Sequence, residues 1–154
     1  MLYRCYSLFR RNLPVRIRQY TFFLLHQGKK YIDECGPANF FGIKNNTYIT
    51  PKSESILNSI TNMSLIDIAR SMGIKTERRQ VPVEELSSFV ETGACGTAAV
   101  ISPIARIFDP EKNMIYEYCK NGEPGAYTMK LYNRLVSIQN GDEPDTFGWI
   151  TIVD

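Results

Sequence analysis

Apolar residues recur at helical spacing in two places along the chain. In residues 61–73 they share one face and comprise Leu65, Ile68, Ala69 and Met72. Thr61 can cap the start of this helix, and Gly73 can cap its end. Pro124 starts a second helix that Gly141 ends, and one face of it carries Tyr127, Leu131, Leu135 and Ile138. The pattern predicts two amphipathic helices.

Short apolar runs between turn residues predict strands over much of the remaining chain. Residues 40–44 and 47–50 predict a hairpin around Asn45 and Asn46, a pair that tolerates positive φ. The other expected strands cover residues 20–25, 75–81, 98–101, 105–108 and 114–118, and a short helix is expected from Pro82 through Glu84 and Glu85. Elements in this order predict an α+β fold.

Composition limits the chain to one modest domain. It has 154 residues, of which 44% are hydrophobic, and a formal net charge of +2, so it can bury one core. No apolar run is long enough to span a bilayer, and we expect no membrane partner. Because much of the positive charge lies near the N-terminus, the body of the chain is close to neutral, and we expect no nucleic-acid partner.

The four cysteines, Cys5, Cys35, Cys95 and Cys119, are widely spaced and form no C-x-x-C pair. Since His26 is the only histidine, the sequence offers no metal-ligand set, and we expect no metal. In the absence of a signal peptide, reduced thiols predict a cytoplasmic protein.

The segment Glu91–Ile104 has small residues where backbone can approach a ligand closely. Gly93 and Gly96 lack a Cβ, and Thr97 adds a hydroxyl beside main-chain N–H groups, a combination that can hold a phosphate or a carboxylate. The same run is also how an ordinary buried strand begins. The helix start near Ile60 is a second possible anion site, because the first N–H groups of a helix are unpaired.

A third segment, Tyr31–Lys44, is aromatic-rich and strand-like, but Glu34 and Asn39 interrupt it. A carboxylate buried in such a run needs a cationic partner or a proton. The alternative for Glu34 is a solvated glutamate on a strand.

These three segments, in this order, resemble the C-terminal half of a branched-chain aminotransferase, a class IV (fold type IV) pyridoxal-phosphate enzyme. The resemblance covers about residues 28–154 and is carried by residues 31–44, 47–53, 55–61, 91–104 and 138–142 with Trp149. It implies the C-terminal large domain of the D-amino acid aminotransferase-like fold, in which helices flank a mixed or antiparallel sheet. It also implies a homodimer in the intact family.

The resemblance implies roles for residues in each segment. Glu34 is similar to the carboxylate that pairs with the pyridine nitrogen of pyridoxal phosphate and keeps it protonated. Ile60 and Thr61 resemble the residues whose N–H and hydroxyl groups hold the cofactor phosphate, and Thr97 completes that site.

The implied reaction moves an amino group between leucine, isoleucine or valine and 2-oxoglutarate. Ala98 and Ala99 are similar to the residues whose backbone N–H groups receive the carboxylate of the amino-acid or 2-oxo-acid substrate. The family's Schiff-base lysine would lie about three dozen residues before Glu34 and therefore ahead of Met1, so we expect no catalytic lysine in this chain. The alternative is an inactive remnant that acts, if at all, only as a packing partner. Asn58 departs from the family, which usually has a proline there.

Residues 1–27 differ in kind from the rest of the chain. They contain Arg4, Arg10, Arg11, Arg16 and Arg18 and no acidic residue. Three origins are open: an organellar transit segment, a basic arm for nucleic acid or anionic lipid, and unrelated sequence joined to a truncated or frameshifted coding region. The third fits best, because family-like sequence starts abruptly near Gly28. We therefore predict a divergent segment at 1–27, disordered or frameshifted, and the class IV aminotransferase C-terminal domain at 28–154.

Overall fold

Strands outnumber helices in the computed structural model, which describes residues 3–7, 22–24, 30–119 and 122–153. The elements in chain order are β1 (Tyr3–Ser7), β2 (Phe22–Leu24), β3 (Tyr31–Ile32), β4 (Glu34–Cys35), β5 (Ala38–Lys44), β6 (Thr47–Pro51), α1 (Ile60–Ser71), β7 (Lys75–Arg79), β8 (Val81–Pro82), the 3₁₀ helix η2 (Val83–Ser88), β9 (Glu91–Gly96), β10 (Val100–Asp109), β11 (Met114–Glu117) and α2 (Ala126–Asn140). The expected α+β fold is confirmed.

The main sheet closes on itself. Its strand order is β11-β10-β1-β2-β4-β5-β6-β7, and β9 pairs with both β5 and β10. Strands β10, β1, β2, β4, β5 and β9 therefore form a closed ring of hydrogen-bonded neighbours, with every pair antiparallel. Strands β6 and β7, outside this ring, pair in parallel. The sheet is mixed, as the resemblance implies.

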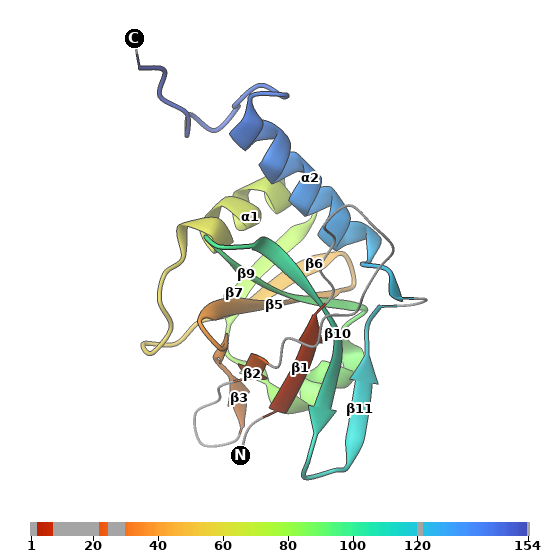
Figure 1. Ribbon diagram of the computed structural model, residues 1–154. Coiled ribbons are helices and arrows are strands. Elements are labelled where there is room, and N and C mark those ends of the chain that lie inside the picture. The colour runs from red at the N-terminus through yellow and green to blue at the C-terminus, as the bar shows by residue number, and fades with distance from the viewer. Residues whose placement is uncertain (1–2, 8–21, 25–29, 120–121, 154) are drawn as a thin grey trace.

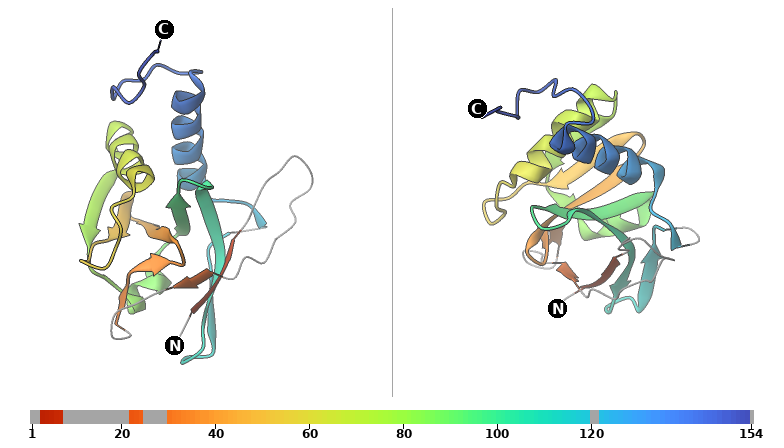
Figure 2. Two further views of the ribbon diagram at one scale, coloured as in Figure 1. Left: turned by 60° about the vertical axis from the view of Figure 1, so that its left-hand side comes forward. Right: turned by 45° about the horizontal axis from the view of Figure 1, so that its top comes forward.

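Both helices lie on one side of the sheet and contact each other (Figures 1 and 2). Two apolar cores follow from this arrangement. One is covered by the helices, and its largest members are Phe41, Tyr48, Leu65, Ile68 and Leu131. The other lies on the opposite face of the strands, and its members include Phe40, Leu86, Phe89, Ile104 and Ile107. Successive residues of β5 thus enter different cores, as the two-residue period of a strand requires.

The predicted hairpin is confirmed as β5 and β6. Asn45 and Asn46 have φ values of 48° and 54°, the left-handed conformation that asparagine tolerates. The two strands predicted at 98–101 and 105–108 are one strand, β10. Pro103 is the last residue of β10 that pairs with β9, and the next residue, Ile104, pairs with β1. Proline tolerates such a position, where a strand changes partners.

Both predicted helices are present, with corrected ends. Ser59, and not Thr61, is the N-cap of α1, and Met72 at its other end is 40% exposed instead of packed with the apolar face. Gly73 follows with φ of 72°, consistent with a helix end. Helix α2 begins at Ala126 and ends at Gly141, which has φ of 76°.

Two strands fall within the predicted N-terminal segment. Strand β1 pairs with β10 and β2, and β2 also pairs with β4. The strand expected at 20–25 is therefore found at 22–24. Most of residues 1–27 lie outside the described part of the chain, and the domain boundary at residue 28 stays a prediction.

Candidate functional site

Glu34 on β4 lies directly opposite Asn39 on β5. Glu34 Oε1 accepts a hydrogen bond from Asn39 Nδ2 at 3.3 Å and another from the backbone N–H of Leu57 at 3.2 Å. Asn39 Nδ2 also donates to the Leu57 carbonyl at 3.2 Å. These contacts hold the half-buried carboxylate against the loop that leads into α1. Both of these bonds go to Oε1, and none of the described residues donates a hydrogen bond to Oε2.

The start of α1 is open. Ser59 Oγ accepts the N–H of Asn62 at 3.3 Å, and the Ser59 carbonyl accepts the N–H of Met63 at 3.0 Å. Among the described residues nothing accepts a hydrogen bond from the N–H of Ile60 or Thr61, and the first turn has no acidic residue. The Ile60 side chain is 81% exposed. Two free donors and the positive end of the helix dipole therefore face outward.

A chain of hydrogen bonds fixes the first turn of α1 to the sheet. Asn62 Oδ1 accepts from the Tyr48 hydroxyl at 2.8 Å, and Asn62 Nδ2 donates to Thr50 Oγ1 at 3.0 Å. Thr50 in turn donates to the Phe40 carbonyl at 2.7 Å. The Tyr48 hydroxyl is also 4.0 Å from Sγ of Cys95 on β9. The start of α1 and the end of β9 therefore meet at one tyrosine.

Burial sets the protonation of this tyrosine and cysteine. It raises the pKa of Tyr48 well above its ordinary value, and it raises the pKa of Cys95 to about 12. Both groups keep their protons at neutral pH, so Tyr48 remains a hydrogen-bond donor to Asn62. A thiol with so high a pKa is a poor nucleophile, and Cys95 acts as a packing residue.

Residues 97–99 form the turn between β9 and β10, and the first two are exposed while the third is half-buried. A Cβ added at Gly96 would lie 3.9 Å from Cβ of Ala38, which places this turn beside the one between β4 and β5. Val100 has φ of 56°, a strained value for a β-branched residue. Strain of this kind often accompanies a functional turn.

Alternate residues of β9, namely Glu91, Gly93 and Cys95, face the helices, and each makes a different contact. Glu91 bonds to the start of α2, while Cys95 contacts Tyr48. Between them, a Cβ on Gly93 would lie 2.4 Å from the ring of Phe41, so this glycine makes room for an aromatic ring. The alternative interpretation of this run, an ordinary buried strand, is confirmed for Glu91–Gly96.

Contacts link the segments that carry the predicted residues. Leu57 connects Glu34 to the loop before α1, and Tyr48 connects the start of α1 to the strand that ends at the 97–99 turn. The roles of Glu34, Ile60, Thr61, Thr97, Ala98 and Ala99 stay predictions. Sequence reasoning did not assign roles to Ser59 or Tyr48, although a serine two residues before a threonine at a helix start is a recognisable capping signal.

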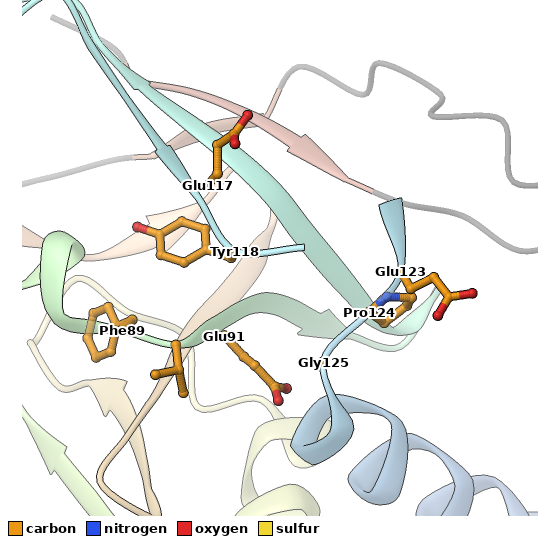
Figure 3. Close-up of a pocket in the computed structure, with 8 residues that line it drawn as sticks. Phe89, Glu91, Glu117, Tyr118, Glu123, Pro124 and Gly125 are labelled. Atoms are coloured by element: carbon orange, nitrogen blue, oxygen red, sulfur yellow. The ribbon is translucent and has the colours of Figure 1, made fainter. Parts of the chain in front are cut away.

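A pocket of about 580 Å³ lies at the other end of β9 and is lined by Phe89, Val90, Glu91, Glu117, Tyr118, Glu123, Pro124 and Gly125. Figure 3 shows the Glu91 side chain pointing toward the start of α2. Glu91 accepts the N–H groups of Tyr127 and Thr128, at 3.0 Å and 2.8 Å, and the Thr128 hydroxyl at 2.8 Å. Its carboxylate already has partners, and we place the candidate site at the α1 end.

Two further features bear on function. No group of three His, Cys, Asp or Glu side chains in the described residues is arranged to hold a metal ion. In the same part of the chain, no helix is long and apolar enough to cross a bilayer.

Residues 11–107 match the sequence profile of the family Amino-transferase class IV. The chain belongs to this family. The match begins inside the predicted N-terminal segment and includes Glu34, the start of α1 and the 97–99 turn. A branched-chain-amino-acid aminotransferase from Haemophilus influenzae is 47% identical over 125 residues, which are 80% of this chain and 36% of that protein. The chain thus spans little more than a third of this class IV relative.

Solved class IV structures share the fold. Branched-chain amino acid aminotransferase from Escherichia coli superposes with a TM-score of 0.68 at 27% identity, over 80% of this chain and 39% of that one. A second branched-chain amino acid aminotransferase, from T.th. and solved with pyridoxamine 5'-phosphate, gives a TM-score of 0.70 at 23% identity, over 85% of this chain and 41% of that one. The resemblance to branched-chain aminotransferases is confirmed over this part of their length.

Proposed function

We propose that this chain forms the cofactor-binding part of a branched-chain amino acid aminotransferase, which moves an amino group between leucine, isoleucine or valine and 2-oxoglutarate. Family membership and the 47% identity to the Haemophilus influenzae relative support the reaction class. The observation that carries the proposal is the open start of α1, whose free N–H groups adjoin the loop that holds Glu34. A dianion and a cationic ring nitrogen have complementary partners there.

The proposed cofactor is pyridoxal 5'-phosphate, which supplies an electron-accepting ring when bound. Oε2 of Glu34 would accept a hydrogen bond from the protonated pyridine nitrogen, because Oε1 already accepts from Asn39 and Leu57. The N–H groups of Ile60 and Thr61 would bind the phosphate, together with the Thr61 hydroxyl and Thr97. The carboxylate and the helix start are at fixed positions before any ligand arrives, so little ordering accompanies binding.

The substrate carboxylate is assigned to the turn at residues 97–99. The backbone N–H groups of Ala98 and Ala99 would donate to it, and their small side chains leave the approach open. The proposal also includes a cytoplasmic, homodimeric protein, as the resemblance implies.

Titration of the full chain with pyridoxamine 5'-phosphate, followed by ligand fluorescence, tests the cofactor site. We expect saturable binding that inorganic phosphate displaces. T61V and T97V should each weaken binding about tenfold, the loss of one charge-assisted hydrogen bond. T146V, at an exposed position in the segment after α2, is the matched control and should leave the affinity unchanged. Equal affinities in all four proteins would overturn the assignment.

A transamination assay with leucine and 2-oxoglutarate addresses the reaction. Turnover by the chain supports the aminotransferase. Ligand binding without turnover supports the alternative, an inactive remnant that packs against a partner.

A further inference from the structure

We propose that Asn39 is a positioning residue that locks the Glu34 carboxylate and the loop before α1 into one arrangement. The inference rests on the proposed function, because it concerns the carboxylate assigned to the pyridine nitrogen. Asn39 is 4% exposed and lies opposite Glu34 in the β4–β5 pair. Its Nδ2 donates to Glu34 Oε1 at 3.3 Å and to the Leu57 carbonyl at 3.2 Å.

The three residues form a closed triangle of hydrogen bonds. Leu57 donates its N–H to the same Glu34 Oε1 and accepts from Asn39 through its carbonyl. Each member is thus fixed by the other two, and the triangle joins two strands to a loop that is more than fifteen residues away in sequence. Side chains that belong to such networks lose rotamer freedom together.

Asn39 keeps this orientation although its amide oxygen, Oδ1, accepts no hydrogen bond from the described residues. Asn39 Oδ1 is buried and has no hydrogen-bond partner in the described part of the chain. A buried acceptor without a donor costs about 1–3 kcal/mol, and its presence in a native fold calls for an explanation. Turning the amide over would not help, because Oδ1 would then face two acceptors, Glu34 Oε1 and the Leu57 carbonyl. The amide is therefore held by the two bonds that Nδ2 donates.

As a consequence, the two carboxylate oxygens of Glu34 have different roles in the site. Oε1 is committed to Asn39 and Leu57, and Oε2 is left for a donor from outside the described residues. Without Asn39 the carboxylate could rotate and offer either oxygen, and its tie to the loop would depend on Leu57 alone. Asn39 thereby connects Glu34, the carboxylate assigned to the pyridine ring, with the start of α1, which is assigned to the cofactor phosphate.

The test compares the wild-type chain with N39L, which keeps the number and branching of the side-chain heavy atoms and removes the donor, and with E34Q. The probe is pyridoxamine 5'-phosphate labelled with ¹⁵N in the ring, whose chemical shift reports protonation of the pyridine nitrogen. We expect a protonated nitrogen at neutral pH in the wild type, loss of protonation in E34Q, and in N39L a ring that deprotonates at lower pH with about tenfold weaker binding. T128V removes a buried hydroxyl at the other end of β9 and controls for lost stability.

A second measurement needs no ligand. Hydrogen exchange at the Leu57 amide should be at least about tenfold faster in N39L than in the wild type and unchanged in T128V, because the acceptor Glu34 is no longer held. Unchanged exchange at Leu57 overturns the role of Asn39 whether or not the probe binds. If exchange and the ¹⁵N shift respond in N39L but the wild type and E34Q have the same ring protonation, the assignment of Glu34 fails instead.

Discussion

The N-termini of the two helices are capped differently, although the same strand, β9, is linked to both. Glu91 bonds directly to the start of α2, and Cys95 is linked to the start of α1 through Tyr48. At α2, Glu91 from β9 supplies a buried carboxylate that accepts two backbone N–H groups and one hydroxyl. At α1, a local serine accepts a single N–H, the first turn has no acid, and Ile60 is exposed. Both ends carry the same positive dipole. Glu91 interacts with one of them, whereas the first turn of α1 has no acidic residue, and we propose that an anion binds there.

The contrast shows how one strand can combine a stability role with a binding role. The side of β9 that faces the helices starts at Glu91 and reaches Cys95 beside Tyr48. At the first end of β9 the Glu91 carboxylate is hydrogen-bonded to α2, and the other end continues into the largely exposed turn at residues 97–99. Substitutions at the Glu91 end should therefore change the free energy of unfolding, while those at the end near residues 97–99 should change ligand binding.

The largest effect is expected from E91A. It leaves two N–H groups and a buried hydroxyl at the start of α2 without an acceptor, and we expect a loss of about 3 kcal/mol in the free energy of unfolding. Urea denaturation measures it. S59A, which removes the weaker cap of α1, is the comparison and should cost about 1 kcal/mol. Equal losses in the two variants would contradict the contrast.

The next test adds a methyl group at Gly125, beside the first residue of β9, and at Gly96, the last residue of β9. A Cβ on Gly125 would lie 1.9 Å from Cδ of Glu91, whereas a Cβ on Gly96 would meet only Ala38, at 3.9 Å. G125A should displace the carboxylate and cost about 2 kcal/mol, because the cap is lost or distorted. G96A should change stability by less than about 0.5 kcal/mol. Thermal unfolding of both variants decides, and a G125A protein as stable as G96A would refute the packing.

Sealing the open helix start should have opposite effects on folding and binding. I60E places a carboxylate in the first turn of α1, at a position that is 81% exposed. We expect a gain in stability of up to about 0.5 kcal/mol from the helix dipole and about tenfold weaker binding of pyridoxamine 5'-phosphate. I60Q has the same length without the charge and should bind nearly as the wild type does. Equal weakening in both variants would show that charge is not the cause.

The smallest expected effect is the pH dependence of the stability that Glu85 contributes. Hydrogen bonds from Arg79, which also donates to Glu77, hold the pKa of Glu85 below its ordinary value. A lowered pKa in the folded state stabilises the fold above the unfolded value of about 4.5, and this contribution is lost as pH falls through the folded value. The difference in stability between wild type and E85Q should be about 1 kcal/mol or less at pH 7, since Arg79 is partly exposed, and should shrink below pH 4.5. A difference that stays constant down to about pH 3, roughly a full unit below the carboxyl's usual range, would contradict this.

The elements of the fold follow well from sequence where the signal is local. The Asn45-Asn46 hairpin and, apart from Met72, the apolar faces of both helices are set by neighbouring residues, and they match the structure. The cap of α1 was misplaced by two residues, because serine and threonine at positions 59 and 61 carry the same chemical signal.

What sequence could not supply is pairing between distant segments. Glu91 caps a helix that begins 35 residues later, and no local pattern announces it. The sequence left two interpretations of Gly93 open, a ligand cradle and a buried strand, because the ring that needs its missing Cβ belongs to Phe41, on another strand. The site itself was located by family resemblance, while the contacts among Glu34, Asn39 and Leu57 required coordinates.

The closed ring of strands also has a consequence for how the chain folds. Strand β1 at residues 3–7 pairs with β10, whose partner residues are 104–108, so the ring cannot close until nearly the whole sheet has been synthesised. Pairing over such a separation has a large entropic barrier, and folding rates fall as contacts become less local. Before β10 pairs, β1 and β9 each lack a neighbour on one edge, and unpaired strand edges promote aggregation.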